Sequence, residues 1–181
     1  MESDERLRLF SALLLPPAAV DTVVAWQAVE LASTGNDLRL VPRENLHVTL
    51  AFLGSTPAAK AGEAGDALRE ACAGRERPMF AARRYRETRS VAMIELADDG
   101  GRGGEIAEAV FGALEARGLY RREERRWLPH VTVARFHSRP RLSPALPDLN
   151  EVAPSDAAVM ISRLRPGGAQ YEVFESVSLG G

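Results

Sequence analysis

The residue types best suited to proton transfer lie in two short motifs of the same form, His47-Val48-Thr49-Leu50 and His130-Val131-Thr132-Val133. In each motif an aliphatic residue follows every polar one, which is the two-residue period of a β-strand, so the histidine and the threonine project from the same face. The chain has three histidines, and the repeat places two of them at matching positions. The two motifs therefore predict one site built from two strands.

Each motif also has a purely structural interpretation. A single histidine on a strand is more often a hydrogen-bonded structural residue than a catalyst, and threonine is a good strand former. A short repeat can also arise by chance in a chain rich in Ala, Leu and Val. The scarcity of histidine favours the functional interpretation, because two of the three are used at equivalent places.

Two imidazoles that face each other across a cleft are suited to displacement at phosphorus. Near neutral pH one imidazole can accept a proton from water while the other donates one to the departing oxygen, and each transfer typically contributes about 10²- to 10⁴-fold. The two threonine hydroxyls would donate hydrogen bonds to the non-bridging phosphate oxygens. No metal is needed where the leaving oxygen is already strained, as in a five-membered 2′,3′-cyclic phosphate.

Other site chemistries have little support in the sequence. There is no Gly-x-Ser-x-Gly motif, no cysteine with a histidine near it in the sequence, and no Gly-x-x-x-x-Gly-Lys loop for a nucleoside triphosphate. The one cysteine, Cys72, lies in an Ala-rich helical pattern, and the histidines are not at metal-ligand spacing. We therefore expect no metal and no cofactor.

Composition and the amino terminus favour a globular cytoplasmic protein. The 181 residues are 45% hydrophobic and 27% charged, and no apolar run approaches the roughly 18 to 20 residues that cross a bilayer. The start, Met1-Glu2-Ser3-Asp4-Glu5-Arg6, is acidic where an export signal would be basic. A net charge of −2 argues against sequence-blind nucleic-acid binding, although it leaves room for a local basic cleft.

Arginines supply candidate phosphate contacts around the motifs. Arg135 would fall on the face opposite His130 in a regular strand, so it is either a surface residue or is turned into the cleft by a bulge. Two arginine groups are candidates to line the cleft, although a solvated strand face and a charged loop are the commoner explanation: Arg83, Arg84, Arg86 and Arg89, and Arg121, Arg122, Arg125 and Arg126.

Aromatic residues near the motifs are candidate platforms for a nucleobase. They are Phe10, Phe52, Tyr85 and Trp127, although most such residues pack into a core. Trp127 is the preferred candidate, because it stands just before the second motif. His137 follows that strand, and we expect it to be exposed and inert.

The order of elements predicts an α+β protein. We expect strands and helices over these residues: strand 6–15, a helix from Pro16-Pro17 to Gly35-Asn36, strand 38–41, the first motif strand up to Gly54, a helix capped by Thr56 and ending near Ala73, a hairpin of strands 78–86 and 89–96, helix 104–117, the second motif strand, and closing strands 157–164 and 171–179. The segment 138–154 holds four prolines, so no long regular element is expected there. Residues 1–181 then form a single domain of two intertwined lobes, with one motif in each: a bilobal fold of two mostly antiparallel sheets related by a pseudo-twofold axis, with helices on the outside and a central cleft.

These residues resemble the 2H phosphoesterases, and within them the RNA 2′,3′-cyclic phosphodiesterases, also called 2′-5′ RNA ligases. The resemblance runs nearly from end to end, and its most specific stretch is Val41-Pro42-Arg43-Glu44-Asn45-Leu46-His47-Val48-Thr49-Leu50-Ala51-Phe52-Leu53-Gly54. It also includes Arg8 to Leu13, Pro129 to Arg135 and Gln170 to Phe174.

The resemblance implies hydrolysis of a 2′,3′-cyclic phosphate on RNA to a 2′-phosphomonoester, with weak ATP-independent 2′-5′ joining of RNA ends. It implies that His47 is the proton donor and His130 the proton acceptor. Thr49, Thr132 and Arg135 would bind the phosphate. The sequence departs from the family in having Trp127 where phenylalanine is common, and Trp127 remains a candidate contact to the substrate.

A second function class stays open, a module that binds RNA ends or nucleotide phosphates without turnover. Either function predicts RNA with a cyclic phosphate end, or a cyclic nucleotide, as the partner of a monomeric protein that needs no membrane. Replacement of His47 or His130 by alanine separates the two, because an enzyme would lose rate steeply and a binder would lose only modest affinity.

Overall fold

The computed structural model describes residues 5–34 and 37–180. The elements, in chain order, are β1 (Arg6–Leu14), α1 (Pro17–Trp26), the π-helical turn η1 (Gln27–Leu31), η2 (Ala32–Thr34), β2 (Arg39–Leu40), η3 (Arg43–Asn45), β3 (His47–Pro57), η4 (Ala58–Lys60), α2 (Ala61–Cys72), β4 (Met79–Glu87), β5 (Val91–Asp99), α3 (Arg102–Ala116), β6 (His130–Arg135), β7 (Asp156–Arg165) and β8 (Gly168–Ser178). Gly35-Asn36, the expected end of the first helix, lies outside the described residues.

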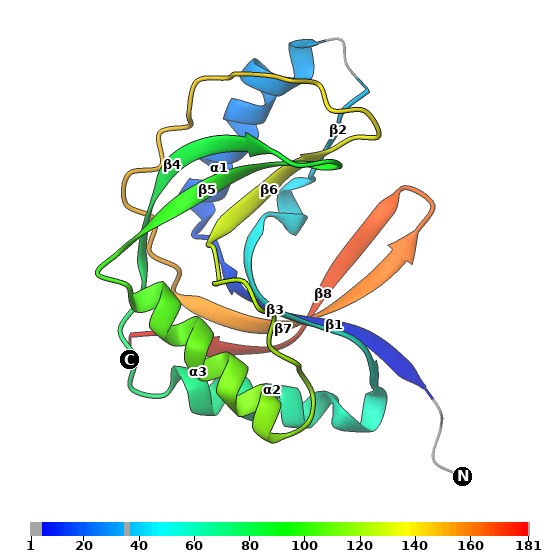
Figure 1. The fold of residues 1–181 in the computed structure, drawn as a ribbon, viewed down its shortest axis with the longest axis vertical. Coiled ribbons are helices and arrows are strands. Elements are labelled where there is room, and N and C mark those ends of the chain that lie inside the picture. The colour runs from blue at the N-terminus through cyan, green and yellow to red at the C-terminus, as the bar shows by residue number, and fades with distance from the viewer. Residues whose placement is uncertain (1–4, 35–36, 181) are drawn as a thin grey trace.

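The strands pair antiparallel throughout, in the order β4-β5-β6-β3-β1-β7-β8, with β2 beside β6. This confirms the α+β class and the antiparallel pairing expected from the sequence. The two expected sheets are the halves of one curled sheet, since β3 and β6 are joined at the register pair Val48 and Val131 (Figure 1). We call the half made of β3, β1, β7 and β8 lobe one, and the half made of β6, β5, β4 and β2 lobe two.

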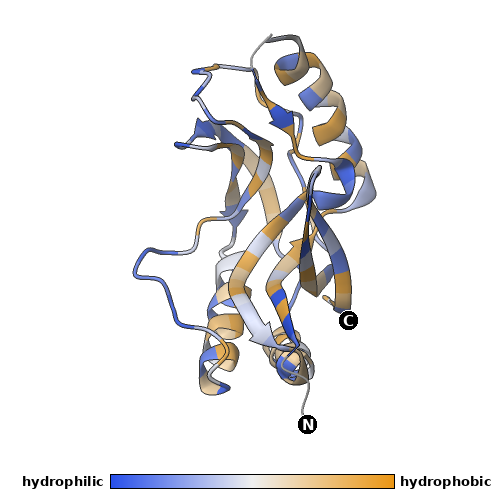
Figure 2. Ribbon diagram, turned by 90° about the vertical axis from the view of Figure 1, so that its right-hand side faces the viewer, coloured by the Kyte–Doolittle hydropathy of each residue, from blue (hydrophilic) through white to orange (hydrophobic). Residues whose placement is uncertain are grey.

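The helices cover the sheet on the side away from the motif side chains. α2 and α3 lie side by side along lobe one, while α1 lies behind lobe two. Val48, Val131 and Val133 are fully buried and join a core that draws residues from both lobes. In Figure 2 apolar stretches run along the strands and the three helices, whereas the linker that leads from α3 to β6 is hydrophilic. Burial of these aliphatic faces leaves the opposite face of each motif strand open.

Two local predictions near the end of β3 were wrong. Gly54 does not end this strand, because β3 continues its pairing with β1 as far as the pair Arg6 and Pro57. Thr56 is therefore a strand residue rather than a helix cap, and α2 begins only after the η4 turn, without a side-chain cap. Pairing with a neighbouring strand outweighs the local preference of the Thr-Pro dipeptide for a helix start.

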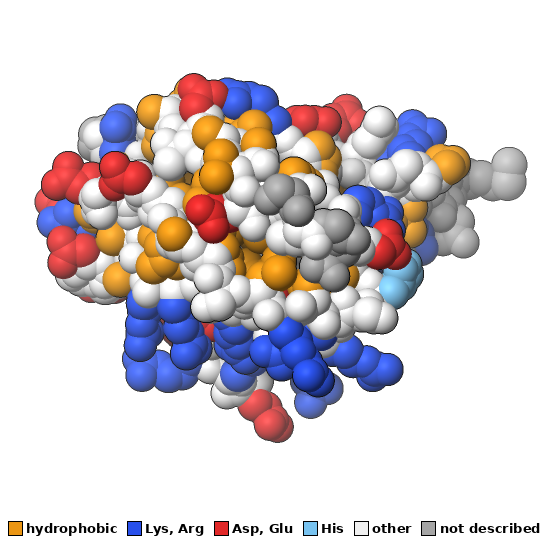
Figure 3. Space-filling view, turned by 90° about the horizontal axis from the view of Figure 1, so that it is seen from above, with side chains coloured by type: hydrophobic (Ala, Val, Ile, Leu, Met, Phe, Trp, Pro, Cys, Tyr) orange, Lys and Arg blue, Asp and Glu red, His pale blue; other side chains and the backbone are white. Residues whose placement is uncertain are grey.

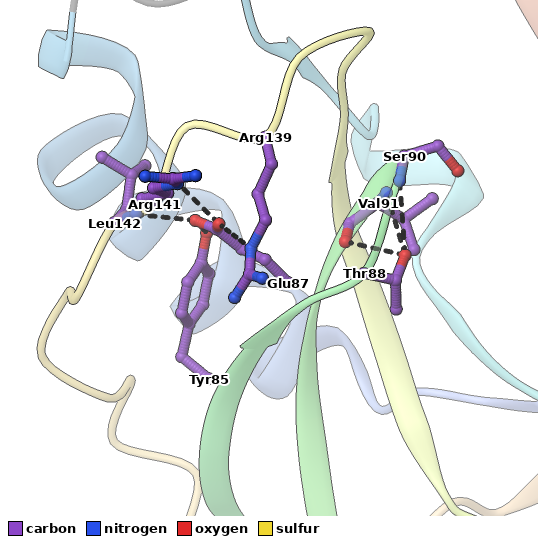
Figure 4. Close-up of polar contacts among 8 residues, drawn as sticks. All are labelled: Tyr85, Glu87, Thr88, Ser90, Val91, Arg139, Arg141 and Leu142. Carbon is purple, nitrogen blue, oxygen red and sulfur yellow. Dashed lines mark hydrogen bonds and ion pairs between the residues drawn. The ribbon is translucent and has the colours of Figure 1, made fainter.

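The proline-rich segment 138–154 has no long regular element, as the sequence predicted. One buried carboxylate anchors it to the end of β4 (Figure 4): Glu87 accepts hydrogen bonds from the main-chain N–H groups of Arg141 and Leu142, the Tyr85 hydroxyl and the Arg139 guanidinium. The side chain of Glu87 is 1% exposed. These donors hold the pKa of Glu87 below its ordinary value although burial by itself would raise it.

No helix within residues 5–34 and 37–180 has both the length and the apolar character needed to cross a membrane.

Candidate active site

The two motif strands lie next to each other and run antiparallel. Continuing the register from the Val48 and Val131 pair by one residue on each side sets His47 opposite Thr132 and Thr49 opposite His130. The four polar side chains then mark a square in which the histidines occupy one diagonal and the threonines the other. Diagonal neighbours across an antiparallel pair are about 7–8 Å apart at the backbone, so the two histidines lie close together on one face of the sheet.

Both imidazoles are fixed by the same main-chain contact. His47 Nδ1 lies 2.7 Å from the carbonyl oxygen of Asn45, and His130 Nδ1 lies 2.8 Å from that of Leu128. Because a carbonyl oxygen only accepts, each Nδ1 carries the proton, and each Nε2 is left for chemistry. The contact spans two residues in both motifs, so the local twofold relation extends from the strands to the orientation of the rings.

His47 is the more enclosed of the two histidines. Its ring centroid lies 5.0 Å from that of Phe10 and 5.4 Å from that of Tyr171. Burial lowers the pKa of His47 to about 4; the charges of His130 and Arg135 also lower it, against the opposing effect of its main-chain hydrogen bond. In the free protein near pH 7 His47 is thus a neutral imidazole, and its Nε2 accepts a hydrogen bond from the Thr49 hydroxyl at 2.9 Å.

Matching bulges occur at the last residue of each motif. In β6 the residue Val133 is extra relative to β5, and in β3 the residue Leu50 is extra relative to β1. A bulge of this kind reverses which side chains point to which face. Arg135 consequently shares the face of Thr132 and His130, which the sequence had left open between the surface and the cleft, and Phe52 takes the equivalent place in β3.

A pocket of about 620 Å³ opens on this face. The linker between α3 and β6 forms one wall, and the sheet forms the floor. The residues that line it are Thr49, Leu50, Ala51, Phe52, Arg86, Thr88, Val91, Met93, Phe111, Tyr120, Glu123, Arg125, Arg126, Trp127, Leu128, His130, Thr132 and Arg135. His47 is not among these residues, and its ring packs against those of Phe10 and Tyr171.

The two sides of the site differ in polarity. On lobe one, Phe10, Ala12, Ala158 and Met160 form a small buried apolar cluster against Tyr171, and the ring of Phe52, 5.9 Å from that of Phe10, is 64% exposed above it. On lobe two the pocket floor carries Arg86 and Arg135, and Arg84 and Glu95 lie in register with His130 on the same face of the sheet. An apolar surface thus borders His47, and a charged one borders His130.

Trp127 lies in the pocket wall, but its indole N–H is already used. It donates to the main-chain oxygen of Thr49 at 3.0 Å, and its ring lies 6.4 Å from that of Phe80. Trp127 therefore ties the linker to the first motif strand. Of the other aromatic candidates, Tyr85 packs against Trp26 on the core side of lobe two.

Some of the candidate arginines in residues 83–89 and 121–126 line the pocket, and others do not. Arg86, Arg125 and Arg126 line the pocket, as the sequence allowed. Arg122 instead forms ion pairs with Glu108 and Glu115 on α3. His137 is exposed, as expected.

Sequence reasoning missed Glu95 and gave Tyr171 no role in the site. Glu95 stands in register with His130 on the neighbouring strand and is fully buried. Its only signal was a single charged residue inside the apolar run Val91 to Leu96. Tyr171 reaches His47 from β8, and no spacing in the sequence connects the two. In the described part of the chain no three His, Cys, Asp or Glu side chains are grouped so as to hold a metal ion.

Comparison with known proteins supports the fold. The family model for LigT-like phosphoesterases matches residues 13–89. TT0787 of Thermus thermophilus is 28% identical, with 97% of this chain and 99% of that chain covered and a TM-score of 0.78. E. coli LigT complexed with 3′-AMP is 22% identical, with 98% and 100% covered and a TM-score of 0.73. The MHV ns2 PDE domain is 19% identical, with 81% and 98% covered and a TM-score of 0.56. A search of curated proteins found no match.

The fold and the site define a two-lobed α+β protein with one His-x-Thr strand in each lobe. This fold is that of the LigT-like phosphoesterases, and the resemblance to the 2H phosphoesterases is confirmed.

Proposed function

We propose that the protein hydrolyses 2′,3′-cyclic phosphate ends of RNA to 2′-phosphomonoesters without a metal ion, and that it joins RNA ends through a 2′-5′ bond as a side reaction without ATP. We further propose that it does so as a cytoplasmic monomer. The observation that carries the proposal is the diagonal placement of His47 and His130, each with Nδ1 held by a main-chain carbonyl. This arrangement supplies one proton donor and one proton acceptor on opposite sides of a single phosphorus atom.

The reaction needs two proton transfers and one displacement. His130 Nε2 takes a proton from water as the water oxygen attacks phosphorus, and the bond from phosphorus to the ribose 3′ oxygen breaks. His47 gives its Nε2 proton to that oxygen. The products are a 3′-hydroxyl and a 2′-phosphomonoester, and solvent exchange returns each imidazole to its starting state.

The remaining side chains of the square serve the phosphate. Thr49 and Thr132 are placed to donate hydroxyl hydrogen bonds to its non-bridging oxygens, and Arg135 to add a charged donor on the same face. The hydroxyl of Thr49 contacts His47 in the free protein, so a bound phosphate would take over a donor that is already aimed at the site.

The lowered pKa of His47 makes its protonation depend on the substrate. A histidine with a pKa near 4 is almost wholly neutral at pH 7. The negative charge of a cyclic phosphate between the two rings favours the imidazolium form and raises this pKa. His47 then becomes a proton donor only when a phosphate is bound, which limits its charge in the empty site.

The apolar side of the cleft suits the nucleoside. The leaving ribose oxygen must face His47, and Phe52, Phe10 and Tyr171 lie on that side. The exposed ring of Phe52 offers a stacking surface for a base, and Trp127 extends the opposite wall. Structures of E. coli LigT complexed with 3′-AMP, NADP+ and ATP support a nucleotide as the ligand class.

The test is a product assay with a 2′,3′-cyclic nucleotide and with an oligoribonucleotide that ends in a cyclic phosphate. We expect the 2′-phosphate as product, at a rate that EDTA leaves unchanged. Strict dependence on a divalent ion, or a 3′-phosphate product, would contradict the mechanism. Tight binding of the cyclic nucleotide without any product would instead support the second candidate, a phosphate-binding module, for which the enclosed and uncharged His47 is the favouring observation.

A further inference from the structure

Beyond the reacting square, lobe two carries a buried carboxylate held by two arginines. Glu95 is fully buried. Arg84 donates to it twice, through Nε at 2.5 Å and through a terminal nitrogen at 3.0 Å, and Arg86 donates once at 2.9 Å. The Arg84 hydrogen bond, followed by that of Arg86, holds the pKa of Glu95 below its ordinary value against the effect of burial. The group is thus a fixed anion under two cations, with a net positive charge.

A bulge in β4 directs these arginines to the face of the sheet that carries His130. Ala82 pairs with Leu96 and packs against the core, yet Arg84 pairs with Glu95, so Arg83 is the extra residue between them. The bulge moves the even-numbered residues of β4 from the core face to the cleft face. A regular strand would have buried both arginines instead.

Most of each guanidinium is left to meet a ligand. The side chains of Arg84 and Arg86 are 58% and 48% exposed, and in the described part of the chain their other N–H groups have no partner. Seen from above, Lys and Arg side chains gather along the side of the molecule that faces the viewer in Figure 1 (Figure 3). Glu95 fixes the direction of the two cations, so a phosphate that binds them meets donors already in place.

The location of the pair is set by the strand order. Arg84, Glu95 and His130 lie in one row across β4, β5 and β6, so the arginine backbone is about 10 Å from that of His130 at the usual strand spacing. The row continues away from His47, which lies on β3. In an in-line displacement the group that attacks phosphorus arrives on the side of the proton acceptor, here His130.

We infer that Arg84 and Arg86, anchored by Glu95, form a phosphate-binding subsite for a second RNA strand, the one whose 5′-hydroxyl takes the place of water. The inference rests on the proposed function, because the direction of attack is taken from it. The 5′ oxygen attacks phosphorus, its proton passes to His130, the bond to the 3′ oxygen breaks, and His47 protonates that oxygen. The product is a 2′-5′ phosphodiester, with no other reactant needed.

The test uses an oligoribonucleotide with hydroxyl groups at both ends as an inhibitor of cyclic nucleotide hydrolysis, measured by release of the 2′-phosphate. Because both ligands bind at once, the oligonucleotide lowers the rate even at saturating cyclic nucleotide. The triple variant Arg84→Gln, Arg86→Gln, Glu95→Gln leaves no buried carboxylate unpaired. In this variant the oligonucleotide concentration needed for half-maximal inhibition should rise about tenfold or more. The salt dependence of oligonucleotide binding falls by about 0.7 in slope for each phosphate that the triple variant no longer neutralises.

Glu95→Gln alone keeps both cations but removes their anchor, and we expect a smaller loss of inhibition by the oligonucleotide than in the triple variant. Arg102→Gln is the matched control, since Arg102 is equally exposed and paired with Glu76 at the start of α3, outside the pocket. The inference is overturned if the oligonucleotide competes with the cyclic nucleotide, or if it inhibits the triple variant as strongly as the native protein. If the native protein hydrolyses no cyclic nucleotide, the proposed function fails by itself. Direct binding of the labelled oligonucleotide then tests the subsite. Equal affinities of the native protein and the triple variant for the oligonucleotide would contradict the subsite.

Discussion

Phe52 in β3 and Arg135 in β6 occupy equivalent positions, each three residues after the threonine of its motif and just beyond a bulge. The two lobes thus use the same backbone device to aim different side chains at one cleft. On lobe one it presents an aromatic ring, and on lobe two a guanidinium. This pair marks the division of the cleft into an apolar side, to which we assign the nucleoside, and a charged side, to which we assign the phosphates.

The pair leads to a reciprocal prediction. Phe52→Ala should weaken binding of a 2′-nucleotide by about fivefold to a hundredfold, the range for one stacked base, and leave inorganic phosphate binding nearly unchanged. Arg135→Gln should weaken both, because it removes a charged donor to the phosphate. Calorimetric titration with the two ligands measures this. Equal losses of both ligands in Phe52→Ala would show that its ring supports the fold rather than the base.

Replacement of either motif histidine should stop turnover without loss of the fold. His47→Ala and His130→Ala should each lower kcat for a 2′,3′-cyclic nucleotide by about 10²- to 10⁴-fold. His137→Ala is the matched control, because this exposed residue lies just after β6, and its kcat should be native. A kcat within about threefold of the native value in either motif variant would contradict proton transfer by that histidine.

The pKa of His47 gives a prediction in solution. Folded-state titration of this ring by NMR should have its midpoint near pH 4, because burial disfavours the cation. Saturating inorganic phosphate should raise the midpoint by about 1–3 units, the usual effect of an opposite charge within contact distance. The His47→Gln variant identifies the resonance. A midpoint that does not move with phosphate bound would mean that the anion does not lie between the two rings.

The same shift has a consequence for stability. In the unfolded chain His47 takes up a proton near its ordinary pKa of 6.5, while the folded protein resists protonation down to about pH 4. The unfolded state therefore binds more protons in this window, and His47 makes the fold less stable as the pH falls from 6.5 to 4. Urea unfolding should show a smaller loss over that range in His47→Gln than in the native protein.

Glu87 should control the stability of the segment 138–154. Glu87→Gln replaces one of the two acceptor oxygens with an NH₂ group, so one of the two main-chain N–H groups is left facing a donor, and the free energy of unfolding at pH 7 should fall by about 2 kcal/mol. The pKa of Glu87 is lowered in the folded state, so its contribution is present above its unfolded pKa and is lost as the pH falls through the folded one. Glu172→Gln, an exposed ion-pair partner of Arg163, is the control and should change stability little. A native urea midpoint in Glu87→Gln would refute the anchor.

Most of the architecture can be predicted from the sequence because strand alternation and helix periodicity are strong local signals. The two-residue period of a strand predicts one shared face for the four motif side chains, His47, Thr49, His130 and Thr132. The structure has these residues on one face. Thr56 was misassigned because pairing with β1, a contact with residues about fifty positions away, outweighs a local capping pattern.

The bulges could not be predicted, although they decide the chemistry of the cleft walls. Leu50, Arg83 and Val133 are ordinary strand residues, and nothing local marks them as extra; only the register with the partner strand does. For the same reason Arg135 stayed undecided between two faces. Glu95 was visible only as an isolated charge in an apolar strand, and its meaning depends on Arg84 and Arg86 across the hairpin.

The most direct test of the central claim is to identify the product formed from a 2′,3′-cyclic nucleotide, in the presence of EDTA, by the native protein and by the two motif-histidine variants. The account predicts a 2′-phosphomonoester from the native protein and almost none from His47→Ala or His130→Ala. A 3′-phosphomonoester, or product formation that persists when either imidazole is removed, would contradict it.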